Sequence, residues 1–172
     1  MRMPYTGHYA SPLGGMLLAA DDAGLTGLWF EGQKHFARGL GDAHEEREIP
    51  LFDETRRWLD QYFSGREPDF TPPLHPLGTA FEREVWAILR AVPYGKTTTY
   101  GAIATQLAKR RGLAHMSAQA VGGAIARNPI SIVIPCHRVL GADGSLTGYA
   151  GGLAAKRFLL AHEGAAFSEK RG

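Results

Sequence analysis

A proline-rich segment near the middle of the chain limits how the 172 residues can fold. The stretch SGREPDFTPPLHPLG, residues 64–78, contains four prolines. Proline lacks a backbone N–H and fixes φ, so this stretch is unsuited to a helix or a central strand. We therefore predict a linker here, with one domain over residues 1–75 and a second over residues 76–172. The chain is long enough for one or two small hydrophobic cores.

The first half has the pattern of a small α/β domain. Two short apolar runs, residues 16–20 and 25–30, flank the turn-forming sequence DDAG and predict a β-hairpin. Residues 52–63 place their apolar side chains at roughly helical spacing and predict a helix. Residues 32–48 are polar and predict a loop.

The second half is predicted to be mostly helical. The sequence TAFE from Thr79 to Glu82 is a capping box, in which each residue satisfies a backbone N–H of the other. Ser and Thr residues are placed to begin two further helices, and Gly164 is placed to end a fourth. The predicted helices cover residues 79–91, about 99–109, 117–128 and 152–163.

The second and third of these helices resemble a helix-turn-helix. A basic turn joins them, and the Ala and Gly residues of the later helix allow a close approach to a groove. Residues 79–172 carry 12 Lys/Arg and 5 Asp/Glu, a balance of +7, whereas residues 1–78 carry 7 and 12, a balance of −5. This asymmetry predicts that the second half meets a polyanion. A packed helix pair with a solvated basic surface is the alternative.

The only cysteine, Cys136, lies in the sequence IVIPCHRV. A single cysteine excludes an internal disulfide and a zinc site built on several thiolates, and it suits a reducing cytoplasm. The β-branched run 130–134 predicts a short strand that ends at Pro135, which places the thiol at an element boundary. Both His137 and Arg138 would stabilise a thiolate, the nucleophilic form. We therefore predict a reactive cysteine.

Three other polar residues are candidates to support Cys136. Glu163 lies at the end of a predicted helix, where the helix dipole disfavours a carboxylate, so we expect the His137 imidazole to be its partner. Because adjacent side chains diverge on an extended chain, we expect a water molecule between this imidazole and the thiol. Asn128 can brace the turn that carries Cys136. Tyr100 begins a predicted helix, as a core aromatic or as a functional hydroxyl.

The segment NPISIVIPCHRVLGADGSLTGYAGG resembles the active-site segment of the methylated-DNA–protein-cysteine methyltransferases, the O6-alkylguanine-DNA alkyltransferases. The resemblance runs from about residue 81 to 164 through VWAILRAVPYGKTTTYGAIA, AVGGAIARNP and KRFLLAHEG, whereas residues 1–75 match only in general layout. It implies an α+β fold: a small N-terminal α/β domain with a short antiparallel sheet, and a mostly helical, winged-helix-like C-terminal domain that binds DNA.

The resemblance also implies a reaction. The protein would take the alkyl group from O6-alkylguanine in double-stranded DNA irreversibly onto Cys136, once per molecule. It would act in the cytoplasm as a monomer, without metal, other cofactor or membrane, and several molecules could load along DNA. By resemblance, His137 removes the thiol proton through water, Glu163 orients the imidazole, Asn128 braces the turn, and Tyr100 donates toward the leaving guanine.

The resemblance assigns two further groups of residues. The DNA-binding group is Gln119, Ala120, Gly122, Arg127, Arg138, Arg110 and Arg111. The substrate pocket is Val139, Tyr149, Ala150 and Gly151. One position departs from the family, because many members have Arg where this chain has Gln119. That Arg is thought to fill the space of the flipped base, so the flipping contact is in doubt here, although the chemistry is not.

Three other interpretations fit parts of the pattern. A helix-turn-helix protein without chemistry would keep all its activity after Cys136→Ser. A hydrolase using Cys136, His137 and Glu163 would form more than one product per protein and would need oxyanion donors. A redox-sensing thiol would respond to peroxide without accepting an alkyl group.

Overall fold

The computed structural model describes residues 3–168, which group into two compact units. The first unit contains the chain up to Leu77 together with residues 129–133, and the second contains residues 78–128 and the chain from Ile134 onward. The proline-rich segment has no helix. Its residue Leu74 forms an isolated β-bridge with Leu25, and both residues belong to the first unit. The prolines therefore have the predicted local effect. In the described chain, no helix is both long and apolar enough to span a membrane.

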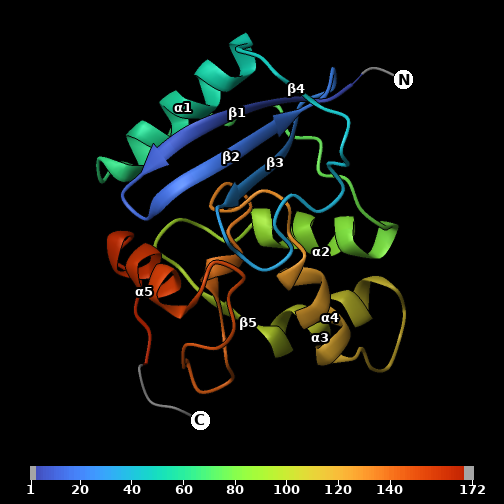
Figure 1. Ribbon diagram of the computed structural model, residues 1–172. Coiled ribbons are helices and arrows are strands. Elements are labelled where there is room, and N and C mark those ends of the chain that lie inside the picture. The colour runs from blue at the N-terminus through green and yellow to red at the C-terminus, as the bar shows by residue number, and fades with distance from the viewer. Residues whose placement is uncertain (1–2, 169–172) are drawn as a thin grey trace. The chain divides into compact units, whose positions relative to one another are not determined.

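The first unit is built on a sheet with the strand order β3-β2-β1-β4 (Figure 1). Its strands are β1 (Tyr5–Ser11), β2 (Gly14–Ala20), β3 (Leu25–Phe30) and β4 (Glu45–Glu46). The pairs β1–β2 and β2–β3 are antiparallel, and β1–β4 is parallel. The predicted hairpin is confirmed, and the Asp21 carboxylate accepts hydrogen bonds from the N–H groups of Ala23 and Gly24 at its turn, at 2.9 and 3.1 Å.

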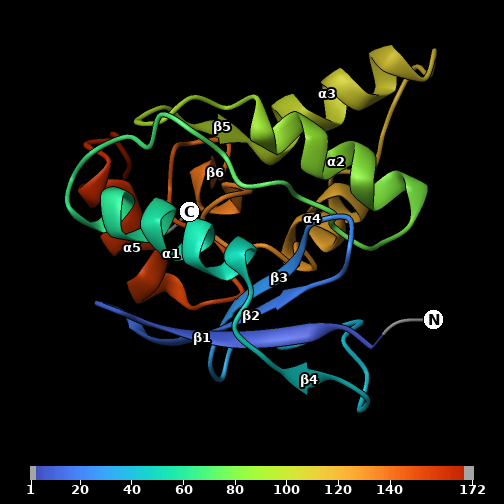
Figure 2. The same cartoon turned by 90° about the horizontal axis from the view of Figure 1, so that it is seen from above.

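Helix α1 (Pro50–Phe63) packs against this sheet, as Figures 1 and 2 show. Proline suits the first turn of a helix because the N–H that it lacks would have no partner there. The helix buries Phe52, Leu59 and Tyr62. A Cβ on Gly7 of β1 would lie 2.9 Å from the Phe52 ring, so glycine permits this close contact.

The second unit contains three mutually packed helices: α2 (Ala80–Arg90), α3 (Tyr100–Arg110) and α4 (Ala118–Ala126). The predicted capping box of Thr79 and Glu82 begins α2, and the Thr99 and Ser117 hydroxyls cap α3 and α4. The helix pair predicted as a helix-turn-helix is thus present.

The chain after α4 differs from the prediction. The strand predicted over residues 130–134 is wrong, since Ile130 forms an isolated bridge with Leu28 and Ile132 has a φ of 70°. The chain instead turns into a short 3-10 helix, η1 (Cys136–Arg138). Strand β6 (Val139–Leu140) follows and pairs in parallel with β5 (Thr98–Thr99), and helix α5 (Leu153–His162) lies against η1.

Candidate active site

Cys136 is the first residue of η1, and its backbone is fixed by contacts with the residues just before it. Pro135 flanks it, and the Cys136 N–H donates to the Ile134 carbonyl at 2.8 Å. The buried Asn128 side chain donates to that same carbonyl, also at 2.8 Å. Asn128 therefore braces the turn that carries the thiol.

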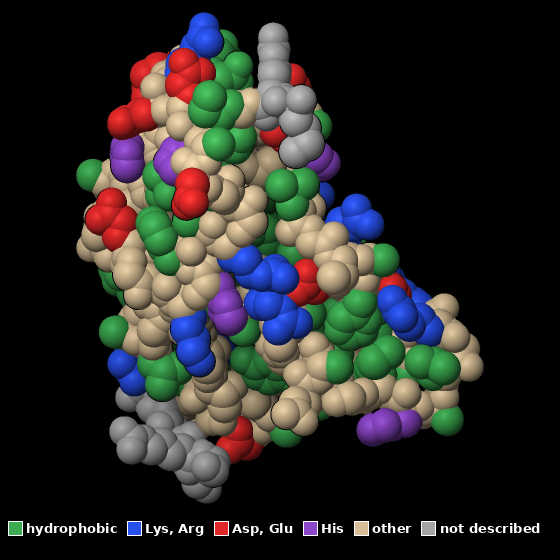
Figure 3. Space-filling model, turned by 45° about the vertical axis from the view of Figure 1, so that its right-hand side comes forward, with side chains coloured by type: hydrophobic (Ala, Val, Ile, Leu, Met, Phe, Trp, Pro, Cys, Tyr) green, Lys and Arg blue, Asp and Glu red, His purple; other side chains and the backbone are tan. Residues whose placement is uncertain are grey.

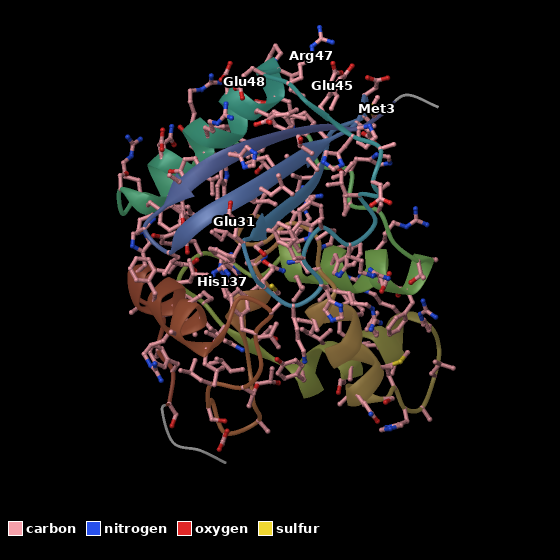
Figure 4. The ribbon with its side chains drawn as sticks, in the orientation of Figure 1. Met3, Glu31, Glu45, Arg47, Glu48 and His137 are labelled. Atoms are coloured by element: carbon pink, nitrogen blue, oxygen red, sulfur yellow. The ribbon has the colours of Figure 1, made fainter. Side chains whose placement is uncertain are left out.

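A buried ionic network adjoins Cys136. The Nε2 atom of His137 lies 2.6 Å from Oε2 of Glu163, and both side chains are 0% exposed. The second oxygen of Glu163 accepts from Arg138 Nε at 2.8 Å and from the Gly95 N–H at 3.3 Å. His137, labelled in Figure 4, lies beside α5, whose C-terminal cap is Glu163. The fold therefore brings together the imidazole of His137, the carboxylate of Glu163 and the guanidinium of Arg138.

The charge of Glu163 determines which nitrogen of the His137 imidazole carries the proton and which one can accept a hydrogen bond. Burial alone would raise the pKa of Glu163, but hydrogen bonds from His137 and Arg138 and the charge of Arg138 hold it well below its usual range. Burial lowers the pKa of His137, so its imidazole is neutral. An ionised carboxylate can only accept, so the imidazole N–H must be on Nε2. The Nδ1 atom of His137 is then an acceptor, and it is buried with no partner among residues 3–168.

The thiol of Cys136 rests in its protonated form. The residue is 6% exposed, and burial raises the pKa of the thiol. Hydrogen bonds from Asn128 and Tyr149 and the charge of Lys156 oppose that increase. The sequence suggested Arg138 as a partner for the thiolate, but in the structure its guanidinium binds Glu163 instead. A base has to remove the proton when the reaction begins.

The candidate pocket residues come from two segments that both follow Cys136 in the sequence. Val139 is buried in β6, and its N–H donates to the Cys136 carbonyl. The half-buried residues Tyr149, Ala150 and Gly151 precede α5. Tyr100 begins α3, and its hydroxyl donates to the Gly148 carbonyl at 3.4 Å. The first turn of α3 thus contacts the segment that contains Tyr149.

The residues assigned to DNA binding have different environments. On α4, Gln119 and Ala120 are exposed and Gly122 is half-buried, and Arg110 is exposed at the end of α3. Arg111 pairs with Glu84 at 2.7 Å, and Arg127 pairs with Glu82 at 2.6 Å. On the face shown in Figure 3, Lys and Arg side chains form separate groups among hydrophobic and uncharged ones.

Arg138, which the resemblance assigned to DNA binding, has buried partners in the structure. Its side chain is 10% exposed, and its guanidinium donates to Glu163 and, at 2.7 Å, to the Val92 carbonyl. These contacts hold Nε and one Nη atom of the guanidinium on buried partners, so the mostly buried side chain is not extended toward a phosphate. Arg138 therefore belongs to the ionic network and not to the exposed residues of α3 and α4.

Sequence reasoning gave Lys156 no role, yet its side chain is buried. It lies on the inward face of α5 with Ala155, Leu159 and Leu160. Their helical spacing in the sequence was the signal that could have identified it. Across residues 3–168, no group of three or more His, Cys, Asp or Glu side chains is placed to hold a metal ion.

Both halves of the chain match models of one family. Residues 5–76 match the ribonuclease-like domain of 6-O-methylguanine DNA methyltransferase, and residues 80–165 match its DNA-binding domain. A methylated-DNA–protein-cysteine methyltransferase from Haemophilus influenzae is 40% identical over 96% of this chain and 89% of its own length. One from Methanosarcina acetivorans is 44% identical over 93% and 98%. The crystal structure of Mycobacterium tuberculosis OGT in complex with DNA has a TM-score of 0.79 and 38% identity, covering 94% of this chain and 92% of that one.

A helical unit that matches a DNA-binding domain, with a cysteine beside a buried His–Glu pair, defines a DNA repair transferase that uses its own cysteine. The chain belongs to the 6-O-methylguanine DNA methyltransferase family, the methylated-DNA–protein-cysteine methyltransferases.

Proposed function

We propose that this chain repairs double-stranded DNA by taking the alkyl group of O6-alkylguanine onto Cys136. The observation that carries the proposal is the neutral His137, which donates from Nε2 to Glu163 and keeps an accepting Nδ1 beside the cysteine turn. A base next to the only thiol of the chain suits nucleophilic catalysis. Family membership supplies the substrate class.

The reaction begins with proton removal. Nδ1 of His137 takes the thiol proton through one water molecule, and the resulting imidazolium is stabilised by the ionised Glu163. The thiolate sulfur attacks the alkyl carbon in line, so the S–C bond forms as the C–O6 bond breaks and its electron pair stays with guanine. Tyr100 donates toward the leaving base, where a donor stabilises the developing charge.

The product accounts for a single turnover. The alkyl group remains on sulfur as a stable thioether, and the chain has no second cysteine that could accept another alkyl group. Each molecule therefore reacts once and acts as a stoichiometric transferase. We place this reaction in the cytoplasm, where a free thiol persists.

DNA recognition is assigned to α3 and α4. The exposed residues Gln119 and Ala120 near the start of α4, with the half-buried Gly122, suit a close approach to a groove. Arg110, Arg111 and Arg127 would contact phosphates, the last two after release from their carboxylate partners. The alkylated nucleotide must leave the stack to reach Cys136, which costs a few kcal/mol and less where pairing is already damaged.

The domain division, the oligomeric state and the substrate pocket complete the proposal. We propose two domains, residues 1–75 and 76–172, and a monomer that loads on DNA, with several molecules able to occupy one duplex. The pocket is formed by Val139, Tyr149, Ala150 and Gly151, with the backbone around Cys136 reading the guanine edge. These assignments are tested by substitution and by footprinting on duplexes of increasing length.

Intact-mass analysis tests the function. The protein is mixed with a duplex containing one O6-methylguanine, and one added methyl is expected, located on Cys136 by peptide mapping. Cys136→Ser is the matched control, and it should bind the duplex without gaining mass. More product than protein would instead indicate a hydrolase, and an unmodified wild type that still binds DNA would indicate a binding protein without chemistry.

A further inference from the structure

Two side chains of α2 that the chemistry above does not use attach it to the end of α4, the helix it packs against. The Glu82 carboxylate accepts from Nε of Arg127 at 2.6 Å. Nε1 of Trp86 donates to the Ala124 carbonyl at 2.9 Å. The last carbonyls of a helix have no partner within the helix, so the indole supplies one. Both attachments lie in the second unit, within the four residues that precede Asn128.

The Glu82 and Glu84 carboxylates of α2 differ in burial. The Glu82 side chain is 3% exposed and pairs with Arg127, whereas the Glu84 side chain is 27% exposed and pairs with Arg111. Water can solvate a partly exposed carboxylate that loses its cation, but a buried carboxylate then stays uncompensated. Arg111 can therefore exchange Glu84 for a phosphate with little loss, whereas Arg127 would leave a buried charge behind.

The guanidinium of Arg127 lies along the surface of α4. A Cβ on Gly123 would be 3.2 and 3.4 Å from its two Nη atoms, so glycine leaves the room that the guanidinium occupies. The same Glu82 carboxylate that holds Nε also accepts from the Thr79 N–H at 3.0 Å in the capping box. Glu82 therefore joins the start of α2 to the C-terminal cap of α4.

The end of α4 leads directly into the brace of the cysteine turn. Arg127 is followed by Asn128, whose side chain donates to the Ile134 carbonyl at 2.8 Å. The Cys136 N–H donates to that carbonyl at the same distance. A shift at the end of α4 would move Asn128 and with it the thiol. Misplacement of reacting groups by about 1 Å can slow a reaction by about 100-fold.

We propose that Glu82 and Arg127 are positioning residues for alkyl transfer, which fix the end of α4 and thereby the Asn128 brace of Cys136. This inference rests on the proposed function, because it concerns the rate at which the thiol takes the alkyl group. The positioning role and the phosphate contact assigned to Arg127 above exclude each other, and the salt dependence of DNA binding decides between them.

The test is single-turnover alkyl transfer to Glu82→Gln, Arg127→Gln and the double variant, from a methylated duplex and from free O6-benzylguanine. Glu82→Gln removes the charge but preserves the capping box, in which Gln also serves. Arg127→Gln should slow both reactions by about 100-fold, because it leaves the buried carboxylate uncompensated. Glu82→Gln and the double variant should slow both by only about tenfold, since neither leaves a buried charge.

Binding to an unmodified duplex separates positioning from a phosphate contact. The affinity of Arg127→Gln and its salt dependence should match those of the wild type, because the guanidinium stays with Glu82 in the complex. A slope of log affinity against log salt that is shallower by about 0.9 would show that Arg127 neutralises a phosphate, and it would overturn the inference.

Glu84→Gln is the matched control, because it removes the more exposed carboxylate of the same helix. It should react with free O6-benzylguanine at the wild-type rate. If the pair only stabilised the fold, the variants would melt earlier but react at the wild-type rate wherever they are folded, and that result would overturn the inference. If Arg127→Gln does not fold, the rates of Glu82→Gln and the double variant still decide.

The wild-type reactions keep the two proposals distinguishable. A wild type that takes no alkyl group from either substrate would contradict the proposed function, and the inference with it. A reactive wild type whose folded variants react equally fast would contradict the inference alone.

Discussion

The two units treat charge in opposite ways. In the first unit the described buried polar residues are uncharged, and its ion pairs, such as His75–Asp21 and Arg56–Glu48, involve partly or largely exposed side chains. The second unit buries Glu82, His137, Arg138, Lys156 and Glu163. Buried charges are expensive unless they are paired, whereas exposed pairs contribute little. The contrast indicates that the first unit uses its interior for stability and the second uses part of its interior for chemistry.

The largest effect is expected from Glu163→Gln, which removes the charge that serves both His137 and Arg138. Breaking a buried network of this kind costs about 3–5 kcal/mol. Loss of the oriented base should slow methyl transfer by about 100-fold or more. Single-turnover rates and urea unfolding measure the two effects, and a variant that is stable yet fully active would contradict the proposed role.

The same variant has a pH signature. The folded-state pKa of Glu163 is lowered, so its ionised form stabilises the fold above the unfolded pKa of about 4.3, and this contribution is lost as the pH falls through the folded value. The stability difference between wild type and Glu163→Gln should therefore be large at pH 7 and shrink below about pH 4. A difference that does not change with pH would indicate lost packing instead of lost charge.

The next effect, on stability alone, is expected from Leu28→Ala in β3. Leu28 is 0% exposed, and truncating such a side chain costs about 2–5 kcal/mol. Thermal unfolding should show the loss, while Cys136 of the folded variant should keep its alkylation rate. A slower reaction at a temperature where the variant is fully folded would show that the first unit also contributes to the chemistry.

A smaller effect is expected from Gln119→Arg on the exposed start of α4. The new charge should change the rate with a methylated duplex more than the rate with free O6-benzylguanine. If the guanidinium reaches a phosphate, the slope of log affinity against log salt should steepen by about 0.9. Equal changes with both substrates would mean that Gln119 does not face DNA.

The smallest effect is expected from Glu48→Gln, the first-unit counterpart of Glu163→Gln. Glu48 pairs with Arg56, but the Glu48 side chain is 67% exposed, so solvent screens the interaction. Repair rate and melting temperature should stay within experimental error of the wild type. A clear loss of repair would break the contrast between the two units.

Local sequence signals predicted the elements whose causes are themselves local. The capping box of Thr79 and Glu82 and the hairpin turn at Asp21 depend on residues a few positions apart, and both are present. Strand β1 was not predicted, because its sequence YTGHYAS lacks a clear apolar alternation and it is stabilised by pairing with β2 and β4. Residues 130–134 were predicted as a strand on β propensity, yet hydrogen bonds from Leu28 to Pro129 and from Ser131 to Leu28 draw this segment into the first unit.

The active site divides in the same way. By itself the sequence identified a lone cysteine, the neighbouring imidazole, a carboxylate in a poor position at a helix end, and the family that these residues resemble. Only the tertiary structure decided that Arg138 binds Glu163, that burial raises the pKa of the thiol, and that the Lys156 side chain of α5 is buried. The physical reason is that pKa values and ion pairs depend on burial and on partners distant in the sequence, whereas residue type and spacing report only local chemistry.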